Sequence, residues 1–542
     1  MKSVVLRTMI TIVIASLAIS ITFAQDTHMS PLQLRGRAGL LAPLAIHLSM
    51  GPALAVEGRH EIVRYVVRVA DPGQRLFELT MALSCPRGGL MLHLPATTPG
   101  DIGLKQHARY LDHFMATDER GKPLQYQRIG TESWRVEVPE RSKVIVKYRI
   151  HMNERDVLRL GTNSIQPGGG FLEGSSVFLY SEDYVENPIE VRFELPKSWA
   201  VVMLLPQAPD GAFLADNYRS LLDAPAQFGT FTERRIPVDD ITVRLIFDSP
   251  LPPYDQKAFD ANVRAIVREE ISFFGAKPFS EYTILIHWRP DLEYGGGLEH
   301  GRAMILNIGK QWMINLPVNA AGTIAHEIFH AWNGEAVHPR ELDKWDFAHA
   351  NYSPQLWFVE GVTNYYAGLT LIRAGVLLRQ DFFEMMSRTI TDYENDPGRE
   401  WLSLEEASIA EWIHPLDSLD YYGGGEVVGF LLDLTIRLET DGRRGLDDVI
   451  RNLYSQSRKP GYRGYSDAEL RAAVREVASR DLGTFFDRHV VRRGLIEYRS
   501  ILKAAGLDLR AEKSAEGQVR YVLVPRRDQT PLQARIWVSI LH

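Results

Sequence analysis

His326-Glu327-Ile328-Phe329-His330 is the stretch of this 542-residue sequence that most narrowly limits its fold and chemistry. In a helix the two histidines lie one turn apart on one face, where both imidazoles can reach a single Zn²⁺ ion, and Glu327 lies close enough to handle water at the metal. A purely structural role is disfavoured, because three ionisable groups on a mostly apolar helix are costly to bury without a metal ion or a charge partner.

The sequence around the motif predicts where this helix begins and ends. Asn319 is the expected N-cap, and apolar or helix-tolerant residues continue to Trp332. Asn333-Gly334 then predicts the end of the helix.

A catalytic zinc site needs a third protein ligand and one open position for water. The metzincin pattern is excluded, because its Gly and second His positions hold Asn333 and Ala336. In the aminopeptidase N family the ligand is a glutamate after eighteen intervening residues, and that position here holds His349. Glu360 is the better candidate, because it interrupts an apolar run and coordination would offset the cost of burying its charge. The alternative for Glu360 is a salt bridge to an arginine.

Two segments resemble the glycyl aminopeptidase family of zinc peptidases. They are residues 326–333, H-E-I-F-H-A-W-N, and residues 356–366, L-W-F-V-E-G-V-T-N-Y-Y. A long interval between the second histidine and the glutamate is the rule in that family, and here Glu360 follows His330 by 30 positions (360 − 330). The resemblance therefore favours Glu360 over His349.

This assignment gives a mechanism as a hypothesis. One Zn²⁺ per chain is held by His326, His330 and Glu360. Glu327 is the general base, which takes a proton from the attacking water and passes it to the leaving amine.

A glycine-rich segment, residues 294–300, lies between two strand-like runs, 282–288 and 303–308. Taken alone it is a Gly-rich hairpin at the edge of a sheet, where Gly296 and Gly297 would let the backbone approach a ligand closely. Its G-G-L-E-H sequence also resembles the exopeptidase motif of the family, which implies that Glu299 binds the free α-amine of the substrate. The resemblance thus favours an aminopeptidase over an endopeptidase.

Attack on a peptide carbonyl develops negative charge that needs a hydrogen-bond donor besides the metal. Residues 420–426, D-Y-Y-G-G-G-E, resemble a Y-Y-x-K-G stretch of the family, and the resemblance implies that Tyr422 is this donor. Gly424 stands where the family has lysine, which predicts a more flexible loop here. The alternative is that Tyr421 and Tyr422 are ordinary aromatic packing before a helix.

The pattern along the chain predicts a multidomain α+β protein. Residues 57–249 show period-two strands and form the expected N-terminal β-rich domain, and 250–253 is a proline-rich boundary. The resemblance implies a thermolysin-like α/β catalytic domain at 254–395. A helical domain is expected at 396–509, with capping boxes at Ser403 and Ser466. The family order of N-terminal motifs is also kept, including Leu221-Leu222-Asp223-Ala224-Pro225.

A short tail, residues 510–542, is expected after the helical domain. It is too short for the PDZ domain that many family members carry. Two segments of it are strand-like, Val519-Tyr521-Leu523 and Ile536-Val538-Ile540.

Composition and the N-terminus limit the partners and the location. A net charge of −7 without a basic run argues against nucleic acid or an anionic membrane as the main partner. Cys85 is the single cysteine, so no intramolecular disulfide can form. Two tandem segments have the form of signal peptides, 1–24 and 29–55, and imply export to the periplasm or the extracellular space. An uncleaved membrane anchor is the rival interpretation of the first segment. No later segment is expected to cross a membrane.

The sequence therefore predicts an exported zinc metallo-aminopeptidase that hydrolyses the first peptide bond of peptides with a free N-terminus. The family implies a preference for small first residues, Gly or Ala. Alternatives are an endopeptidase or another zinc hydrolase on the same scaffold, and a catalytically silent peptide-binding protein.

Overall fold

The structure of the protein is a computed structural model that describes residues 61–85, 88–152, 163–413, 419–494, 496–513 and 519–541. The two candidate signal segments, 1–24 and 29–55, lie outside these residues. Within the described ranges, none of the helices combines the length and apolar character needed to cross a membrane.

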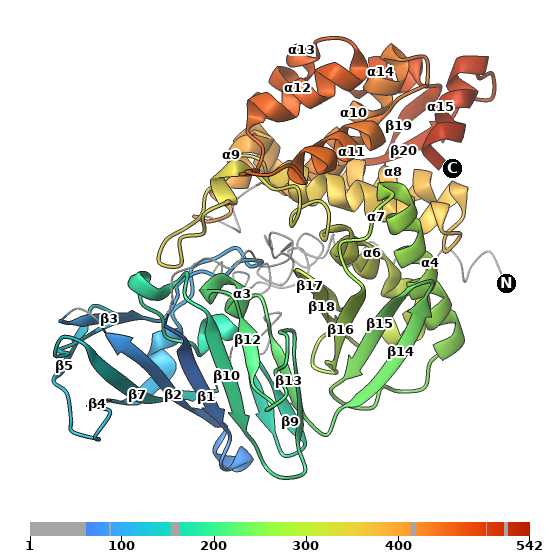
Figure 1. Ribbon diagram of the computed structural model, residues 1–542. Coiled ribbons are helices and arrows are strands. Elements are labelled where there is room, and N and C mark those ends of the chain that lie inside the picture. Colours follow the sequence, from blue (N-terminus) through green and yellow to red (C-terminus); the bar gives the residue numbers. More distant parts are fainter. Residues whose placement is uncertain are drawn as a thin grey trace.

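Three sheets make up the N-terminal part of the chain, as the alternating pattern predicts (Figure 1). A six-stranded sheet has the order β12-β10-β1-β2-β7-β4, with β12 at Phe213–Ala215, β10 at Ile189–Glu194, β1 at Val63–Arg68, β2 at Leu76–Cys85, β7 at Ser142–His151 and β4 at Leu111–Asp118. A four-stranded sheet has the order β11-β13-β9-β8, with β11 at Ala200–Met203, β13 at Ala226–Gly229, β9 at Gly169–Leu172 and β8 at Ser164–Gln166. The smallest sheet joins β3 (Leu90–His93), β6 (Ser133–Val136) and β5 (Tyr126–Ile129). Cys85 is buried at the end of β2.

A five-stranded mixed sheet carries the glycine-rich segment at its edge. Its order is β14-β15-β16-β18-β17, with β14 at Thr232–Val238, β15 at Ile241–Phe247, β16 at Glu281–Trp288, β18 at Ala303–Ile308 and β17 at Gly296–His300. Since β15 pairs with β16, the boundary that the sequence places at 250–253 falls inside this sheet. Period-two alternation identifies a strand but not its partner, so the pattern could not assign β14 and β15 to this sheet.

The helix between β15 and β16, α4 (Gln256–Phe274), has the apolar face and the end that the sequence predicts. Its buried residues include Phe259, Val263 and Ile266, and Gly275 ends it in the left-handed conformation at φ 63°. Asp255 caps its start by accepting from the Ala258 N–H at 3.0 Å.

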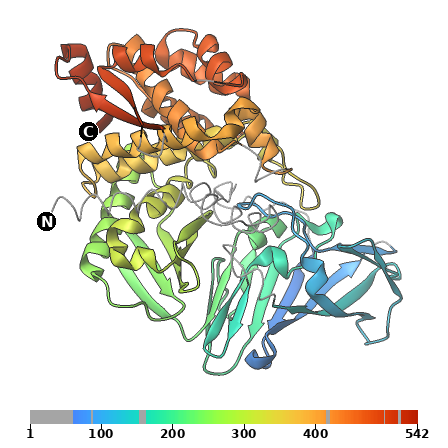
Figure 2. The same ribbon diagram turned by 180° about the vertical axis from the view of Figure 1, so that it is seen from behind.

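The C-terminal part of the chain is helical up to residue 504. Its main helices are α8 (Arg379–Asn395), α9 (Leu404–Ala410), α10 (Tyr421–Glu439), α11 (Leu446–Ser457), α12 (Asp467–Ala478) and α14 (Tyr498–Ala504). Both predicted capping boxes form, at Ser403 with Glu406 and at Ser466 with Glu469. Figures 1 and 2 show these helices above α6 (Ala321–Phe329) and α7 (Val362–Arg373), on the side away from the five-stranded sheet. The mixed, multidomain α+β fold is thus confirmed.

The C-terminal tail is packed onto the helices. It forms a hairpin of β19 (Leu507–Lys513) and β20 (Val519–Pro525), followed by α15 (Pro531–Leu541). β19 therefore crosses the predicted boundary between the helical domain and the tail, between residues 509 and 510. The strand expected at Ile536-Val538-Ile540 is wrong, because Ile536, Trp537, Ile540 and Leu541 form the buried face of α15 while Val538 is exposed.

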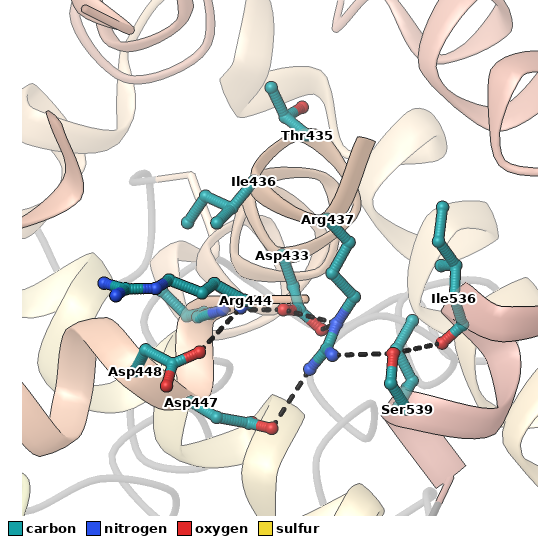
Figure 3. Close-up of polar contacts among 12 residues, drawn as sticks. Asp433, Thr435, Ile436, Arg437, Arg444, Asp447, Asp448, Ile536 and Ser539 are labelled. Carbon is teal, nitrogen blue, oxygen red and sulfur yellow. Dashed lines mark hydrogen bonds and ion pairs between the residues drawn. The ribbon is translucent and has the colours of Figure 1, made fainter. Parts of the chain in front are cut away.

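A buried ion-pair network holds α15 and α11 against α10 (Figure 3). The Arg437 guanidinium donates to Asp433 at 3.0 Å, to Asp447 at 3.0 Å and to the Ser539 hydroxyl of α15 at 2.8 Å. Two hydroxyls of α7 join the same carboxylates, since Tyr365 donates to Asp433 at 2.8 Å and Tyr366 to Asp447 at 2.7 Å. The network therefore joins α7, α10, α11 and α15.

Removing the central cation of this network should strongly destabilise the protein. Arg437→Met keeps much of the side-chain volume but removes the ion-pair partner of the buried Asp433 and leaves Asp447 with Arg373 as its remaining ion-pair partner, which should lower the free energy of unfolding by about 3–5 kcal/mol. Urea unfolding of the wild-type protein and of Arg437→Met measures this loss. The matched control is Arg443→Met, whose pair with Asp441 is exposed and should change stability by about 0.5 kcal/mol or less. Equal effects of the two substitutions would contradict the account.

Candidate metal centre

The side chains of His326, His330 and Glu360 converge on one point. The distance between the two Nε2 atoms is 3.0 Å, and each Nε2 lies 3.3 Å from Oε2 of Glu360. His326 is in α6 and His330 directly follows it, whereas Glu360 lies on a wide helical turn, η8 (Trp357–Gly361), that continues into α7. We call these three atoms the ligand triangle.

The ligand triangle has the size that a tetrahedral zinc ion requires. Zn–N and Zn–O bonds of about 2.0–2.2 Å place neighbouring ligand atoms of a tetrahedron roughly 3.3–3.6 Å apart, close to the edges of the triangle. His330 and Glu360 are 0% exposed. Apart from the two imidazoles, neither oxygen of Glu360 has a hydrogen-bond partner in the described part of the chain. The residues present therefore fit a bound metal ion.

The structure also shows the surroundings of the two alternatives for the third ligand, which are His349 and a salt bridge between Glu360 and an arginine. His349 has a side chain that is 80% exposed and pairs with Asp346 at 3.0 Å, away from the ligand triangle. Glu360 forms ion pairs with the two histidines, and among the described residues it forms none with an arginine or a lysine.

Burial and contact between the histidines and the glutamates shift the pKa values of the four side chains at the site. Burial raises the pKa of Glu327 to about 8, a shift that the charge of Glu360 supports. For Glu360, burial alone would raise the pKa, but contact with His330 and His326 holds it below its ordinary value. Burial and the neighbouring His330 lower the pKa of His326. For His330, burial alone would lower the pKa, but the charges of Glu360 and Glu327 and the hydrogen bonds to Glu360 and Asn333 together raise it above its ordinary value.

Asn333 connects the second histidine to the turn that carries Glu360. The His330 Nδ1–H donates to the Asn333 carbonyl at 2.8 Å, which leaves the lone pair of Nε2 pointing into the ligand triangle. The Asn333 amide donates to the carbonyls of Phe358 at 3.2 Å and Val359 at 3.1 Å. A wide turn alters the backbone hydrogen bonds that its carbonyls accept within the helix. The Asn333 amide donates to two of these carbonyls.

From the sequence, Asn333 is expected only to end the helix that carries His326, and its contact with the turn of Glu360 is not predicted. A side-chain amide next to an apolar helix is buried and must find hydrogen-bond partners, and this requirement is the feature of the sequence that points to such a contact. The predicted N-cap at Asn319 is wrong, because a short helix, α5 (Leu316–Asn319), leads directly into α6 and the Asn319 amide donates to the Trp312 carbonyl at 3.2 Å.

Strand β17 brings Glu299 to the same site. It is the last strand of the five-stranded sheet, antiparallel to β18. Glu299 is 1% exposed, and one of its carboxylate oxygens lies within 4.8 Å of ligand atoms of His330 and Glu360. Glu299, His330 and Glu360 therefore share one buried cluster.

The two glycines before Glu299 have different surroundings. A Cβ on Gly297 would lie 2.4 Å from Oε1 of Glu327 and 2.6 Å from Cγ2 of Thr323, so glycine is needed here to let β17 approach α6. Gly296 pairs with Asn307 of β18. A contact of either backbone with substrate stays a prediction.

Tyr422 lies in the first turn of α10. The flexible loop expected around Gly424 is therefore wrong, because residues 421–439 are helical and Asp420 caps them by accepting from the Tyr422 N–H at 3.0 Å. The Tyr422 ring is 6.2 Å from the His326 ring, centroid to centroid. Its buried hydroxyl has no hydrogen-bond partner of good geometry among the described residues.

Close backbone contact fixes α10 against the Glu360 turn. A Cβ on Gly425 would lie 2.2 Å from the Trp357 carbonyl oxygen, and a Cβ on Gly361 would lie 2.4 Å from the Gly425 backbone. Both positions must be glycine for the helices to cross here. The helix of Tyr422 and the turn of Glu360 are thereby held together.

Two family models match this chain. Residues 64–230 match the Peptidase M61 N-terminal domain, and residues 319–428 match the M61 glycyl aminopeptidase model. Among curated protein sequences, none matches.

Solved structures share the fold at low sequence identity. An aminopeptidase N family protein from Idiomarina loihiensis is 22% identical with a TM-score of 0.77, and the match covers 84% of this chain and 81% of that one. An M1 zinc metallopeptidase from Deinococcus radiodurans, solved with a Tyr-Ser-Ala substrate, is 16% identical with a TM-score of 0.51, over 83% of this chain and 98% of that one. Both likenesses support the multidomain layout.

Loss of the Asn333 amide should weaken metal binding. Asn333→Ala leaves the Phe358 and Val359 carbonyls without their donor, so the turn of Glu360 should shift and the dissociation constant for Zn²⁺ should rise about 10- to 100-fold. Competition with a chromophoric chelator measures that constant. Asn187→Ala is the control, because its amide donates to the Glu61 carbonyl in the β-rich domain. Unchanged Zn²⁺ affinity in a folded Asn333→Ala protein would refute the connecting role.

Proposed function

The chain belongs to the M61 glycyl aminopeptidase family and is a metallopeptidase, and on this basis we propose that it is an exported zinc aminopeptidase. Its substrates are peptides with a free N-terminus, from which it removes the first residue. The observation that carries the proposal is the buried cluster in which Glu299 lies within 4.8 Å of His330 and Glu360. The preference for Gly or Ala rests on the family, and export rests on the sequence of residues 1–55.

In this proposal His326, His330 and Glu360 hold one zinc ion. When bound, zinc supplies a Lewis acid that polarises the substrate carbonyl and lowers the pKa of water. Glu327 takes the proton of the attacking water and delivers it to the leaving amine nitrogen. Its side chain is 5% exposed and packs against the position of Gly297, so β17 restricts its movement.

Charge balance supports recognition of a free amine. The cluster contains three carboxylates, Glu299, Glu327 and Glu360, together with two imidazoles. A nearby divalent cation favours the ionised form of Glu327 and so opposes the effect of burial on its pKa. When all three carboxylates are ionised, the cation neutralises two of them and leaves one negative charge. In this proposal the ammonium group of a peptide N-terminus supplies the missing positive charge, and Glu299 accepts its hydrogen bonds.

Distance supports an exopeptidase over an endopeptidase. Because Glu299 lies so close to the metal residues, a substrate whose ammonium group binds it has room for about one residue before the bond at the metal. A blocked N-terminus loses the ion pair and adds bulk at a buried carboxylate.

Tyr422 is the proposed donor to the oxyanion. Its ring lies beside His326, and its buried hydroxyl is available to a substrate oxygen at the metal. A donor held in place before the reaction stabilises the developing charge without reorganisation at the moment of attack.

Replacing the general base should remove turnover but not the metal. Glu327→Gln keeps the size of the side chain and cannot accept the proton, so kcat for alanine anilide should fall about 10²- to 10⁴-fold. Elemental analysis should still find the wild-type zinc content. The exposed Glu384 on α8 offers a control, Glu384→Gln, with wild-type kcat. Near-normal activity of Glu327→Gln would show that the proton is moved by another group.

Glu299 should decide whether a free amine is required. Wild-type enzyme should hydrolyse alanine anilide and fail on its N-acetyl form. In Glu299→Gln the KM for the free-amine substrate should rise about 10- to 100-fold, the cost of losing a hydrogen bond to a charged group. Steady-state kinetics on both substrates makes the comparison. If wild-type enzyme cleaved only blocked peptides, the aminopeptidase proposal would be overturned.

A further inference from the structure

The turn that ends β17 is held by a carboxylate from the β-rich domain. Asp223 follows a short helix, α3 (Tyr218–Leu222), in the Leu221–Pro225 motif of that domain. Its Oδ2 accepts from the Gly301 N–H at 3.1 Å, and its Oδ1 lies 3.2 Å from Nδ1 of His300. Asp223 and His300 are 8% and 4% exposed, so water screens these contacts little.

These contacts lie directly next to Glu299. Neighbouring side chains of a strand point to opposite faces, so His300 meets Asp223 on one face of β17 while Glu299 meets the metal residues on the other. Leu298, on the same face as His300, belongs to a hydrophobic cluster that includes Phe171 of the β-rich domain. The face of β17 opposite the site is therefore anchored in the N-terminal domain.

The same short helix also reaches the segment that follows the second histidine. Arg219 of α3 donates to the Asp343 carbonyl at 2.8 Å and lies in the field of the Glu335 carboxylate. The Glu335 N–H in turn donates to the His330 carbonyl at 3.0 Å. Helix α3 and Asp223 thus contact both segments that bring Glu299 and His330 together.

We propose that Asp223 is a positioning residue for Glu299: by clamping the His300–Gly301 turn, it fixes the carboxylate that receives the substrate amine. The inference rests on the proposed amine-binding role of Glu299. It makes the β-rich domain a necessary part of substrate recognition. Asp223 acts through the strand and touches no substrate, so its loss affects binding of the ammonium group and leaves the metal and Glu327 in place.

A double-mutant cycle tests this role. Asp223→Asn retains the size and one acceptor oxygen but loses the charge shared by two donors. In the wild-type background it should raise the KM for alanine anilide about three- to tenfold, with kcat within about twofold and unchanged zinc content. In the Glu299→Gln background the same substitution should change KM by less than about twofold, because the group that it positions is already lost.

The controls separate positioning from general damage. Asp210→Asn removes a carboxylate of the same domain that pairs with Arg192 in an exposed ion pair, and it should leave KM unchanged. If Asp223→Asn does not fold, His300→Phe removes the other side of the clamp and carries the same two expectations.

Each remaining outcome decides the matter. An unchanged KM in folded Asp223→Asn overturns the inference and leaves the aminopeptidase proposal intact. An equal rise in both backgrounds also overturns it, because the effect would not pass through Glu299. If Glu299→Gln by itself leaves KM unchanged, the amine-binding role fails and the inference fails with it.

Discussion

The convergence of three buried ligand atoms is the constraint on which the rest of the structure depends. Two imidazole nitrogens 3.0 Å apart and a carboxylate oxygen 3.3 Å from each form a polar cluster at the centre of an apolar core. Such a cluster is expensive to bury unless a cation compensates it. Each surrounding element can be understood by how it holds one of these atoms: α6 carries the histidines, η8 carries Glu360, and Asn333 joins the two.

Close backbone contacts at glycines and buried hydrogen bonds fix the elements that surround the three ligand atoms. Gly361 and Gly425 let η8 and α10 cross in contact, which places the first turn of α10, with Tyr422, beside His326. Farther along the same helices, Tyr365 and Arg437 join the network that also binds α15. On the opposite side Gly297 lets β17 lie against α6 and brings Glu299 within reach of the metal residues. The site is thus assembled from an edge strand, two helices and a wide turn that lie far apart in the sequence.

Local chemistry made part of this structure predictable. Two histidines at helical spacing predict a shared metal ion. Glu360 is the predicted third ligand because its carboxylate interrupts an apolar run. The apolar face of α4, its Gly275 end and both capping boxes also follow from local rules. The remainder depends on long-range contacts. The pairing of β15 with β16 and the reason for glycine at 297 cannot be seen in a local window. In α15, Ile536, Val538 and Ile540 satisfy a strand period by coincidence, whereas burial of Trp537 and Leu541 requires a helix.

The central claim is that one zinc ion lies among His326, His330 and Glu360. Anomalous diffraction from crystals of the zinc-loaded protein, with data collected on both sides of the zinc absorption edge, tests it directly. The account predicts a single strong peak per chain, about 2.0–2.2 Å from both Nε2 atoms and from Oε2 of Glu360. Two results would contradict this claim in a protein that retains stoichiometric zinc. One is a peak at another place in the chain, and the other is a zinc ion bound by His349 in place of Glu360.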